Sequence, residues 1–127
     1  MWPFLLLIES ALSTKGVHMI FSESLKKNED FKKVYGKGKS IANRHLVMYV
    51  LENGLKRNRV GISVSKKVGN SVVRHRVTRL IRESYRISEE HFKCGYDIVI
   101  IARITTKDIS FEEVKSALLH LKELLHI

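Results

Sequence analysis

The residues with the clearest potential for chemistry lie in one stretch, SKKVGNSVVRHRVTRLIRESYR, at positions 65–86. It contains one acid, Glu83, and seven basic residues: Lys66, Lys67, Arg74, Arg76, Arg79, Arg82 and Arg86. A planar guanidinium donates two parallel hydrogen bonds to a phosphate, so grouped arginines favour binding to a phosphate backbone. An ordinary solvated helix face mixes charges of both signs. We therefore interpret this stretch as a surface for RNA or DNA.

Apolar residues in the same stretch recur with helical spacing and predict an amphipathic helix over residues 72–86. Asn70 and Ser71 are suited to cap its start, after a turn at Gly69. Arg74 and Arg76 are expected to flank the apolar stripe. The opposite side is cationic and carries His75, Arg79, Arg82 and Arg86. Glu83 is available to pair with Arg79 or Arg86.

The segment RVGISVSKK before this helix alternates like a strand, with Val60, Ile62 and Val64 on one face. The other face carries Gly61, Ser63, Ser65 and Lys67. Such a face is poor core material and leaves room for a polar ligand to approach closely. Three aromatic residues, Phe31, Tyr35 and Tyr49, are candidates for stacking on unpaired bases or for core packing. A basic groove with aromatics suits single-stranded nucleic acid.

The remaining elements complete a small domain. We expect a helix at residues 28–35 that is capped by Asn28 and ended by Gly36, followed by a flexible connector, GKGKS. Residues 45–52 and the apolar run 97–102 are typical of strands, the latter covered on both faces. Ser110 and Glu113 have capping-box spacing. The helix that follows has an apolar stripe of Phe111, Val114, Leu118, Leu121 and Leu125. The pattern predicts an α/β sandwich of helices packed on a sheet.

Composition limits the possible classes of protein. A chain of 127 residues with one proline suits a single globular domain, and its net charge of +10 favours a polyanionic partner. One cysteine, Cys94, excludes an intramolecular disulfide and favours a cytoplasmic location. We divide the chain into an N-terminal extension without function, residues 1–21, and a domain at residues 22–127. The apolar run near the start is too short to span a bilayer.

Three segments, KNEDFKKVYGKGKSIANRHLVMYV, RVGISVSKKVGNSVVRHRVTRLIRESYR and YDIVIIAR, resemble the bacterial ribonuclease P protein component. The resemblance implies a mixed sheet in the order αβββαβα with an unusual left-handed βαβ crossover. It also implies two RNA partners, the catalytic ribonuclease P RNA and precursor tRNA. The RNA would remove the 5′ leader with Mg²⁺ that it holds itself, and the protein would supply no catalytic or metal-binding residue. No protein partner and no membrane would be needed.

The resemblance also assigns residues. Contacts with the catalytic RNA are carried over to Arg74, His75, Arg76, Arg79, Arg82 and Arg86. Contacts with the leader, in a cleft between sheet and helix, are carried over to Phe31, Tyr35, Val47, Tyr49, Ser63, Lys66 and Lys67. Two departures from the family pattern stand out: His75 replaces the usual Asn, and Thr78 stands where many members have Lys.

Three other classes of protein remain as alternatives. A stand-alone metal nuclease would need clustered carboxylates or histidines, and the sequence shows no such spacing. A ribosomal or other structural RNA-binding protein is compatible with the fold. A membrane-surface protein would explain both the positive charge and the apolar N-terminus.

Overall fold

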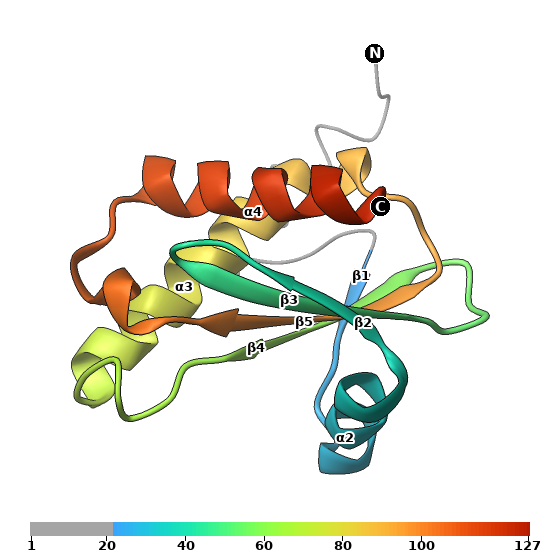
Figure 1. Ribbon diagram of the computed structural model, residues 1–127, viewed down its shortest axis with the longest axis horizontal. Helices are drawn as coiled ribbons and strands as arrows, with labels where there is room; N and C mark the ends of the chain where they lie inside the picture. The colour runs from blue at the N-terminus through green and yellow to red at the C-terminus, as the bar shows by residue number, and fades with distance from the viewer. Residues whose placement is uncertain (1–21) are drawn as a thin grey trace, which may run out of the picture.

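The computed structural model describes residues 22–127 as a sheet of five strands with helices on both faces (Figure 1). The prediction for residues 1–21 lies outside the described residues. The elements in chain order are β1 (Ser22–Ser24), α2 (Asn28–Lys37), β2 (Lys39–Ala42), β3 (Leu46–Glu52), β4 (Asn58–Ser63), α3 (Ser71–Ser88), β5 (Tyr96–Ala102) and α4 (Phe111–Leu125). Two short 3-10 helices, η1 (Glu89–His91) and η2 (Ile104–Asp108), precede β5 and α4.

The sheet is mixed, in the order β1-β4-β5-β3-β2. Strand β5 lies in the centre, parallel to β4 and antiparallel to β3. Helix α3 connects the parallel neighbours β4 and β5, which is the βαβ crossover that the resemblance implied. The left-handed sense of this crossover stays a prediction.

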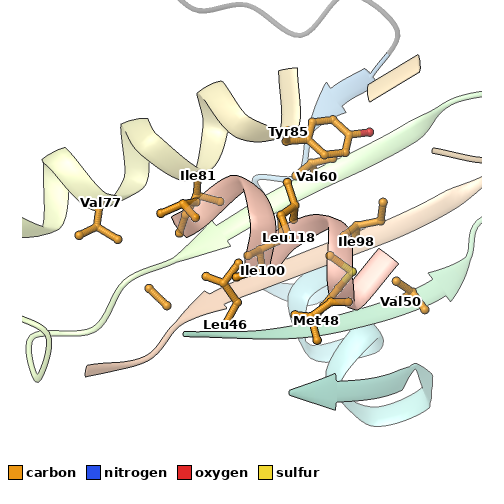
Figure 2. Packing of buried hydrophobic residues seen from close by; sticks show 14 of the residues in the cluster. Leu46, Met48, Val50, Val60, Val77, Ile81, Tyr85, Ile98, Ile100 and Leu118 are labelled. Carbon is orange, nitrogen blue, oxygen red and sulfur yellow. The ribbon is translucent and has the colours of Figure 1, made fainter. Parts of the chain in front are cut away.

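Helices α3 and α4 cover one face of the sheet, and α2 packs on the opposite face (Figure 1). The main core lies under α3 and α4 and includes Leu46, Met48, Val77, Ile81 and Leu118, all fully buried (Figure 2). A smaller cluster of Leu25, Val34 and Val99 lies under α2. Because β5 contributes to both clusters, its apolar run is buried on both faces, as predicted.

The long periodic elements follow the sequence closely. Asn70 caps α3 and its side chain accepts a hydrogen bond from the Val73 N–H at 3.0 Å. Ser110 and Glu113 form the predicted capping box of α4. The buried residues of α4 are Val114, Ala117, Leu118 and Leu121, while Phe111 and Leu125 are only partly buried.

Several boundaries were predicted wrongly. Helix α2 is capped at Lys27 rather than Asn28, and it continues through Gly36 to Lys37. The segment GKGKS is not the expected flexible connector. Its first two residues belong to α2, and its last two belong to β2, which pairs with β3. Strand β1 was not expected at all. Strand β4 ends at Ser63, so the alternation does not continue to Lys67.

Candidate nucleic-acid interface

The basic face of α3 is built by the amphipathic pattern of the helix. Val77 and Ile81 are fully buried against the core and fix the rotation of the helix. His75 and Arg79 consequently face solvent, and Arg82 is half-buried. No hydrogen bond or ion pair involves the side chains of these three residues among residues 22–127. Their donors are therefore available for an external acceptor such as a phosphate.

Arg74 and Arg76 flank the apolar stripe, as predicted, but their surroundings differ. Arg74 is half-buried, and its Nε lies beneath the surface without a hydrogen-bond partner. Arg76 is more exposed, yet it donates hydrogen bonds to two backbone carbonyls, those of Lys107 and Ile109. The two arginines are thus not equivalent surface cations.

Arg86 is already paired within the protein. Its guanidinium donates from Nε to Glu83 Oε2 at 3.2 Å, and a second donor contacts Glu83 Oε1. Glu83 therefore pairs with Arg86, one of its two predicted partners, and not with Arg79. This pairing reduces the positive charge at the C-terminal end of α3 and leaves its centre the more cationic part.

A second candidate surface lies on the sheet face that α2 partly covers. The strand register places Val47 opposite Ile101, and Ile101 opposite Ser63. Tyr49 is opposite Val99 in the neighbouring row. The predicted residues Val47 and Tyr49 on β3 and Ser63 on β4 therefore lie on one face of the sheet, on the two strands that flank β5, and all three are half-buried.

Helix α2 adds two aromatic rings to this face. Tyr35 contacts Tyr49 edge-on, with ring centroids 5.0 Å apart, and Phe31 lies 6.3 Å from Tyr35. Burial raises the pKa of Tyr35, the nearby Tyr49 adds to this, and a side-chain hydrogen bond with Ser63 opposes it. Tyr35 therefore keeps its hydroxyl proton at neutral pH while 39% of the residue remains exposed. We call Phe31, Tyr35, Val47, Tyr49 and Ser63 the aromatic surface.

The glycine on this face has a different role from the one expected. A Cβ atom at Gly61 would lie 2.4 Å from Cζ of Phe31, so the ring of Phe31 fills the space that the sequence suggested for a ligand. Gly61 consequently sets how close α2 comes to the sheet. The part of this face that is open to a candidate ligand therefore lies near Ser63 and Tyr35 and not at Gly61.

Lys66 and Lys67 lie beyond the end of β4, in the turn that leads to α3. Both are exposed, and the turn is closed by a hydrogen bond from the Val68 N–H to the Ser65 carbonyl at 3.1 Å. The turn follows directly on Ser63 and directly precedes α3. It therefore places two cations between the aromatic surface and the basic face of α3.

Sequence reasoning missed one residue that lies within the aromatic surface, between two of its members. Ile101 is half-buried and lies between Val47 and Ser63 in the sheet. It belongs to a continuous apolar run, in which no alternation distinguishes a residue under a helix from one at an open face. Only the register, which depends on the pairing of three strands, reveals its position.

Two hollows occur away from both surfaces. One, of about 570 Å³, lies between the β2–β3 turn and α4 and is lined in part by Arg44, Glu112 and His120. The other, of about 270 Å³, lies beside Lys37, Tyr96 and Ile127. The predicted leader residues line neither of these two hollows.

The acidic and histidine side chains do not form a metal site in the part of the chain that the structure describes. Within residues 22–127, no group of three or more His, Cys, Asp or Glu side chains is arranged to hold a metal ion. No helix in this range is long and apolar enough to cross a membrane.

Comparisons with known proteins agree on one family. The family described as Ribonuclease P matches residues 19–126. The ribonuclease P protein component of Alkaliphilus oremlandii is 56% identical over 103 residues, which are 81% of this chain and 90% of the relative. That of Lachnoclostridium phytofermentans is 59% identical over 103 residues, covering 81% and 89% of the two chains.

Solved structures show the same likeness. The RNase P protein of Staphylococcus aureus superposes with a TM-score of 0.75 at 40% identity, covering 80% of this chain and 94% of the other. The RNase P protein of Thermotoga maritima gives a TM-score of 0.75 at 31% identity, with coverages of 80% and 96%. A further Staphylococcus aureus structure is described as a mutant with defective mRNA degradation activity, and it has a TM-score of 0.77 at 34% identity, with coverages of 96% and 97%.

Proposed function

The chain belongs to the ribonuclease P protein family, and on that basis we propose that it binds the catalytic RNA through α3 and the 5′ leader of precursor tRNA through the aromatic surface. In this proposal the RNA subunit hydrolyses the phosphodiester bond with Mg²⁺ that it holds itself. The protein stabilises the active complex and favours precursor over mature tRNA, because only the precursor carries a leader.

One observation supports the leader site most directly. Tyr35 lies on helix α2 and Tyr49 on strand β3, yet their rings meet edge to face beside the Ser63 hydroxyl. An exposed, fixed ring offers a stacking platform to any unpaired base, and hydroxyl groups beside it offer hydrogen bonds. The exposed Lys66 and Lys67 supply cations for the backbone that connects such bases.

The α3 face supports the second contact by its charge. His75, Arg79 and Arg82 lie on successive turns without partners in the described part of the chain, and the chain as a whole carries a net charge of +10. Neutralising RNA phosphates releases counterions, so binding driven by this face should weaken steeply with salt. By lowering the repulsion between RNA phosphates that approach each other, the same cations would help Mg²⁺ sites in the RNA to fill.

The experiment that tests the proposal is a reconstitution. The protein is mixed with a bacterial ribonuclease P RNA and a precursor tRNA at physiological Mg²⁺, and leader release is followed with each component omitted in turn. We expect cleavage that requires the RNA and is strongly enhanced by the protein. RNA binding without enhancement would instead assign the chain to the structural RNA-binding proteins.

A parallel reaction with an mRNA substrate addresses the activity named for the Staphylococcus aureus relative. In the proposed division of labour the RNA subunit carries the chemistry, so we expect the protein alone to leave both RNAs intact. Cleavage of either RNA by the protein alone would contradict this division.

A further inference from the structure

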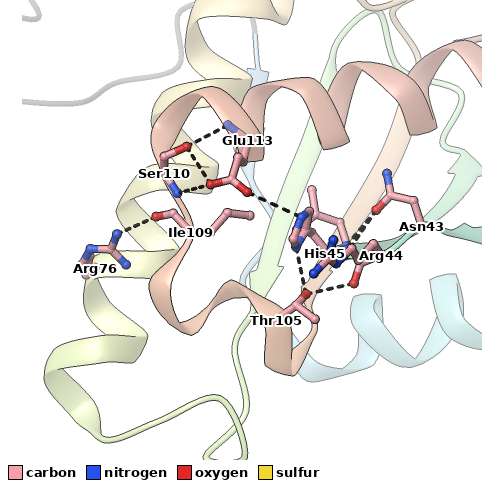
Figure 3. A network of polar contacts seen from close by, with 9 residues as sticks. Asn43, Arg44, His45, Arg76, Thr105, Ile109, Ser110 and Glu113 are labelled. Atoms are coloured by element: carbon pink, nitrogen blue, oxygen red, sulfur yellow. Dashed lines mark hydrogen bonds and ion pairs between the residues drawn. The ribbon is translucent and has the colours of Figure 1, made fainter.

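Arg76 differs from the other basic residues of α3 in what its guanidinium contacts. Nη1 donates a hydrogen bond to the Lys107 carbonyl at 3.2 Å, and Nη2 donates to the Ile109 carbonyl at 2.5 Å. Figure 3 shows this side chain extending from α3 to the connection between η2 and α4. The side chain of Arg79, one turn further along α3, has no such partner in the described range.

The connection that Arg76 contacts is held from its other side as well. Ile109 is 2% exposed, and the next residue, Ser110, caps α4 in a box with Glu113. Oε2 of Glu113 lies 4.0 Å from Nε2 of His45, whose Nδ1 is 2.9 Å from the Thr105 hydroxyl oxygen. Figure 3 shows these contacts as one continuous chain from the β2–β3 turn to α3. Arg76 links this series of contacts to α3.

The chemistry of the contact favours a structural role. One carbonyl of η2 and one just after it converge on the fork of one guanidinium, a geometry that the single nitrogen of an ammonium group matches less well. A phosphate that took both terminal nitrogens would leave these carbonyls without their donors, and unsatisfied polar groups oppose such an exchange. The surrounding side chains His75, Arg79 and Arg82 offer a phosphate free donors at no such cost.

We propose that Arg76 is a positioning residue, which holds the η2–α4 connection against α3 and so fixes the basic face of the helix, rather than a phosphate ligand. This assignment modifies the role that the family resemblance carried over to Arg76. Only the part that concerns RNA affinity rests on the proposed function. The brace itself is a property of the free protein and can be measured without RNA.

The first experiment uses the free full-length chain and amide hydrogen exchange. The Ile109 N–H bonds to the Thr106 carbonyl, and the Thr106 N–H bonds to the Arg103 carbonyl, so both report on the connection. We expect Arg76→Met and Arg76→Lys to accelerate exchange at both amides about tenfold, since local opening loses two hydrogen bonds to a charged group. The matched control, Arg79→Met, should leave both rates unchanged. Unchanged rates in the Arg76 variants would overturn the proposal.

The second experiment measures the affinity for ribonuclease P RNA over a series of potassium chloride concentrations. Loss of a phosphate ligand lowers the slope of log K against log salt by about 0.9, and we expect this for Arg79→Met. For Arg76→Met we expect a Kd that rises about three- to tenfold with an unchanged slope, since one or two hydrogen bonds are lost but no phosphate contact. A slope lowered as much as in Arg79→Met would overturn the proposal. If the wild-type chain did not bind this RNA, the proposed function would fail, and hydrogen exchange alone would decide the role of Arg76.

Discussion

At the scale of single residues, identical side chains on α3 differ in the partners that they already have. Arg79 is exposed without a partner in the described part of the chain, whereas Arg86 is bound to Glu83 on the same helix. A cation that already has an anionic partner must give it up, or share it, before it neutralises a phosphate. Counting arginines in the motif therefore overestimates the charge that the helix presents to RNA.

We predict that Arg79→Ala weakens assembly with the RNA subunit more than Arg86→Ala does. Removing Arg79 deletes a candidate phosphate ligand that has no partner among residues 22–127, which we expect to cost about 1 kcal/mol or more. The guanidinium of Arg86 is already engaged by Glu83 and should contribute less to phosphate binding. The measurement is the Kd for the RNA subunit at fixed salt, with Glu83→Gln as a control that should tighten binding slightly. Equal losses in the two arginine variants would show that the ion pair does not lower the contribution of Arg86.

Tyr35 is predicted to act on precursor tRNA and not on assembly. Tyr35→Ala removes the exposed ring that meets Tyr49, and stacking on one base contributes about 1–3 kcal/mol. Tyr35→Phe keeps the ring and loses only the hydroxyl beside Ser63, so it should retain most of the affinity. The measurement compares the assembled enzyme's affinity for precursor and mature tRNA. A loss for both tRNAs alike would contradict a leader contact.

Gly61 offers a way to disturb the aromatic surface without deleting any aromatic residue. In Gly61→Ala the new methyl group would lie within 3 Å of two atoms of the Phe31 ring, so this ring must move. We predict a selective loss of precursor tRNA affinity, at roughly the level of one stacked base, about 1–3 kcal/mol. Ile62→Val, on the same strand but packed against the main core, is the control for a small change that leaves the aromatic surface untouched. Unaltered precursor binding in Gly61→Ala would show that the position of Phe31 is not important.

At the scale of elements, we expect the stability of the N-terminus of α4 to depend on pH. Hydrogen bonds from the backbone N–H and the hydroxyl of Ser110, together with the nearby charges of His45 and Arg44, lower the pKa of Glu113 from its usual 4.5. A lowered pKa means that the carboxylate stabilises the fold fully above about pH 4.5, and that this contribution is lost as the pH falls through the lowered value. The capping box is thus expected to open in acid.

We predict that Glu113→Gln makes the free energy of unfolding less dependent on pH in the acidic range. The variant should be less stable than the wild type at pH 7, and the difference should shrink as the pH falls below about 4.5. Urea unfolding at several pH values measures this, with the exposed neighbour Glu112→Gln as the control. A difference that stayed constant over the whole range would rule out the carboxylate as its source.

The elements that could be predicted from sequence are those with strong periodicity and a recognisable cap. Helices α3 and α4 were predicted because Asn70 and Ser110 precede long apolar stripes. Strands β1 and β2 could not be predicted, since both are short, polar and at the sheet edges, where pairing with a distant strand decides the conformation. The partners of Arg76 lie 31 and 33 residues away in sequence. No local pattern indicates such a contact.

At the scale of the whole molecule, Arg59 on β4 links the sheet to α2 through two acidic partners. Arg59 on β4 donates two hydrogen bonds to Asp97 on β5, at 2.7 and 2.6 Å, and also lies 3.5 Å from Asp30 on α2. Asp97 is 3% exposed and accepts a further hydrogen bond from Asn53 at 3.0 Å. The sequence showed Asp97 only as the start of an apolar strand, so this link was not foreseen.

We predict that Asp97→Asn lowers the free energy of unfolding by about 3 kcal/mol, because it leaves a largely buried guanidinium without its main partner. The measurement is urea unfolding at neutral pH. The control is Glu23→Gln, which breaks an exposed ion pair with Arg57 and should cost less than about 1 kcal/mol. Similar losses in the two variants would mean that burial does not strengthen the Asp97 pair.

The central position of β5 has a consequence for biosynthesis. Both halves of the sheet pair through this strand, and it comes after more than two thirds of the chain, at Tyr96–Ala102. Until these residues have left the ribosome, β3 and β4 have no strand between them, and the apolar stripe of α3 has no complete sheet to pack on. Because β3 and β4 pair only through β5, we expect the sheet to form in a single step late in synthesis. A released chain that ended before residue 96 would thus carry the complete cationic helix without a folded core beneath it.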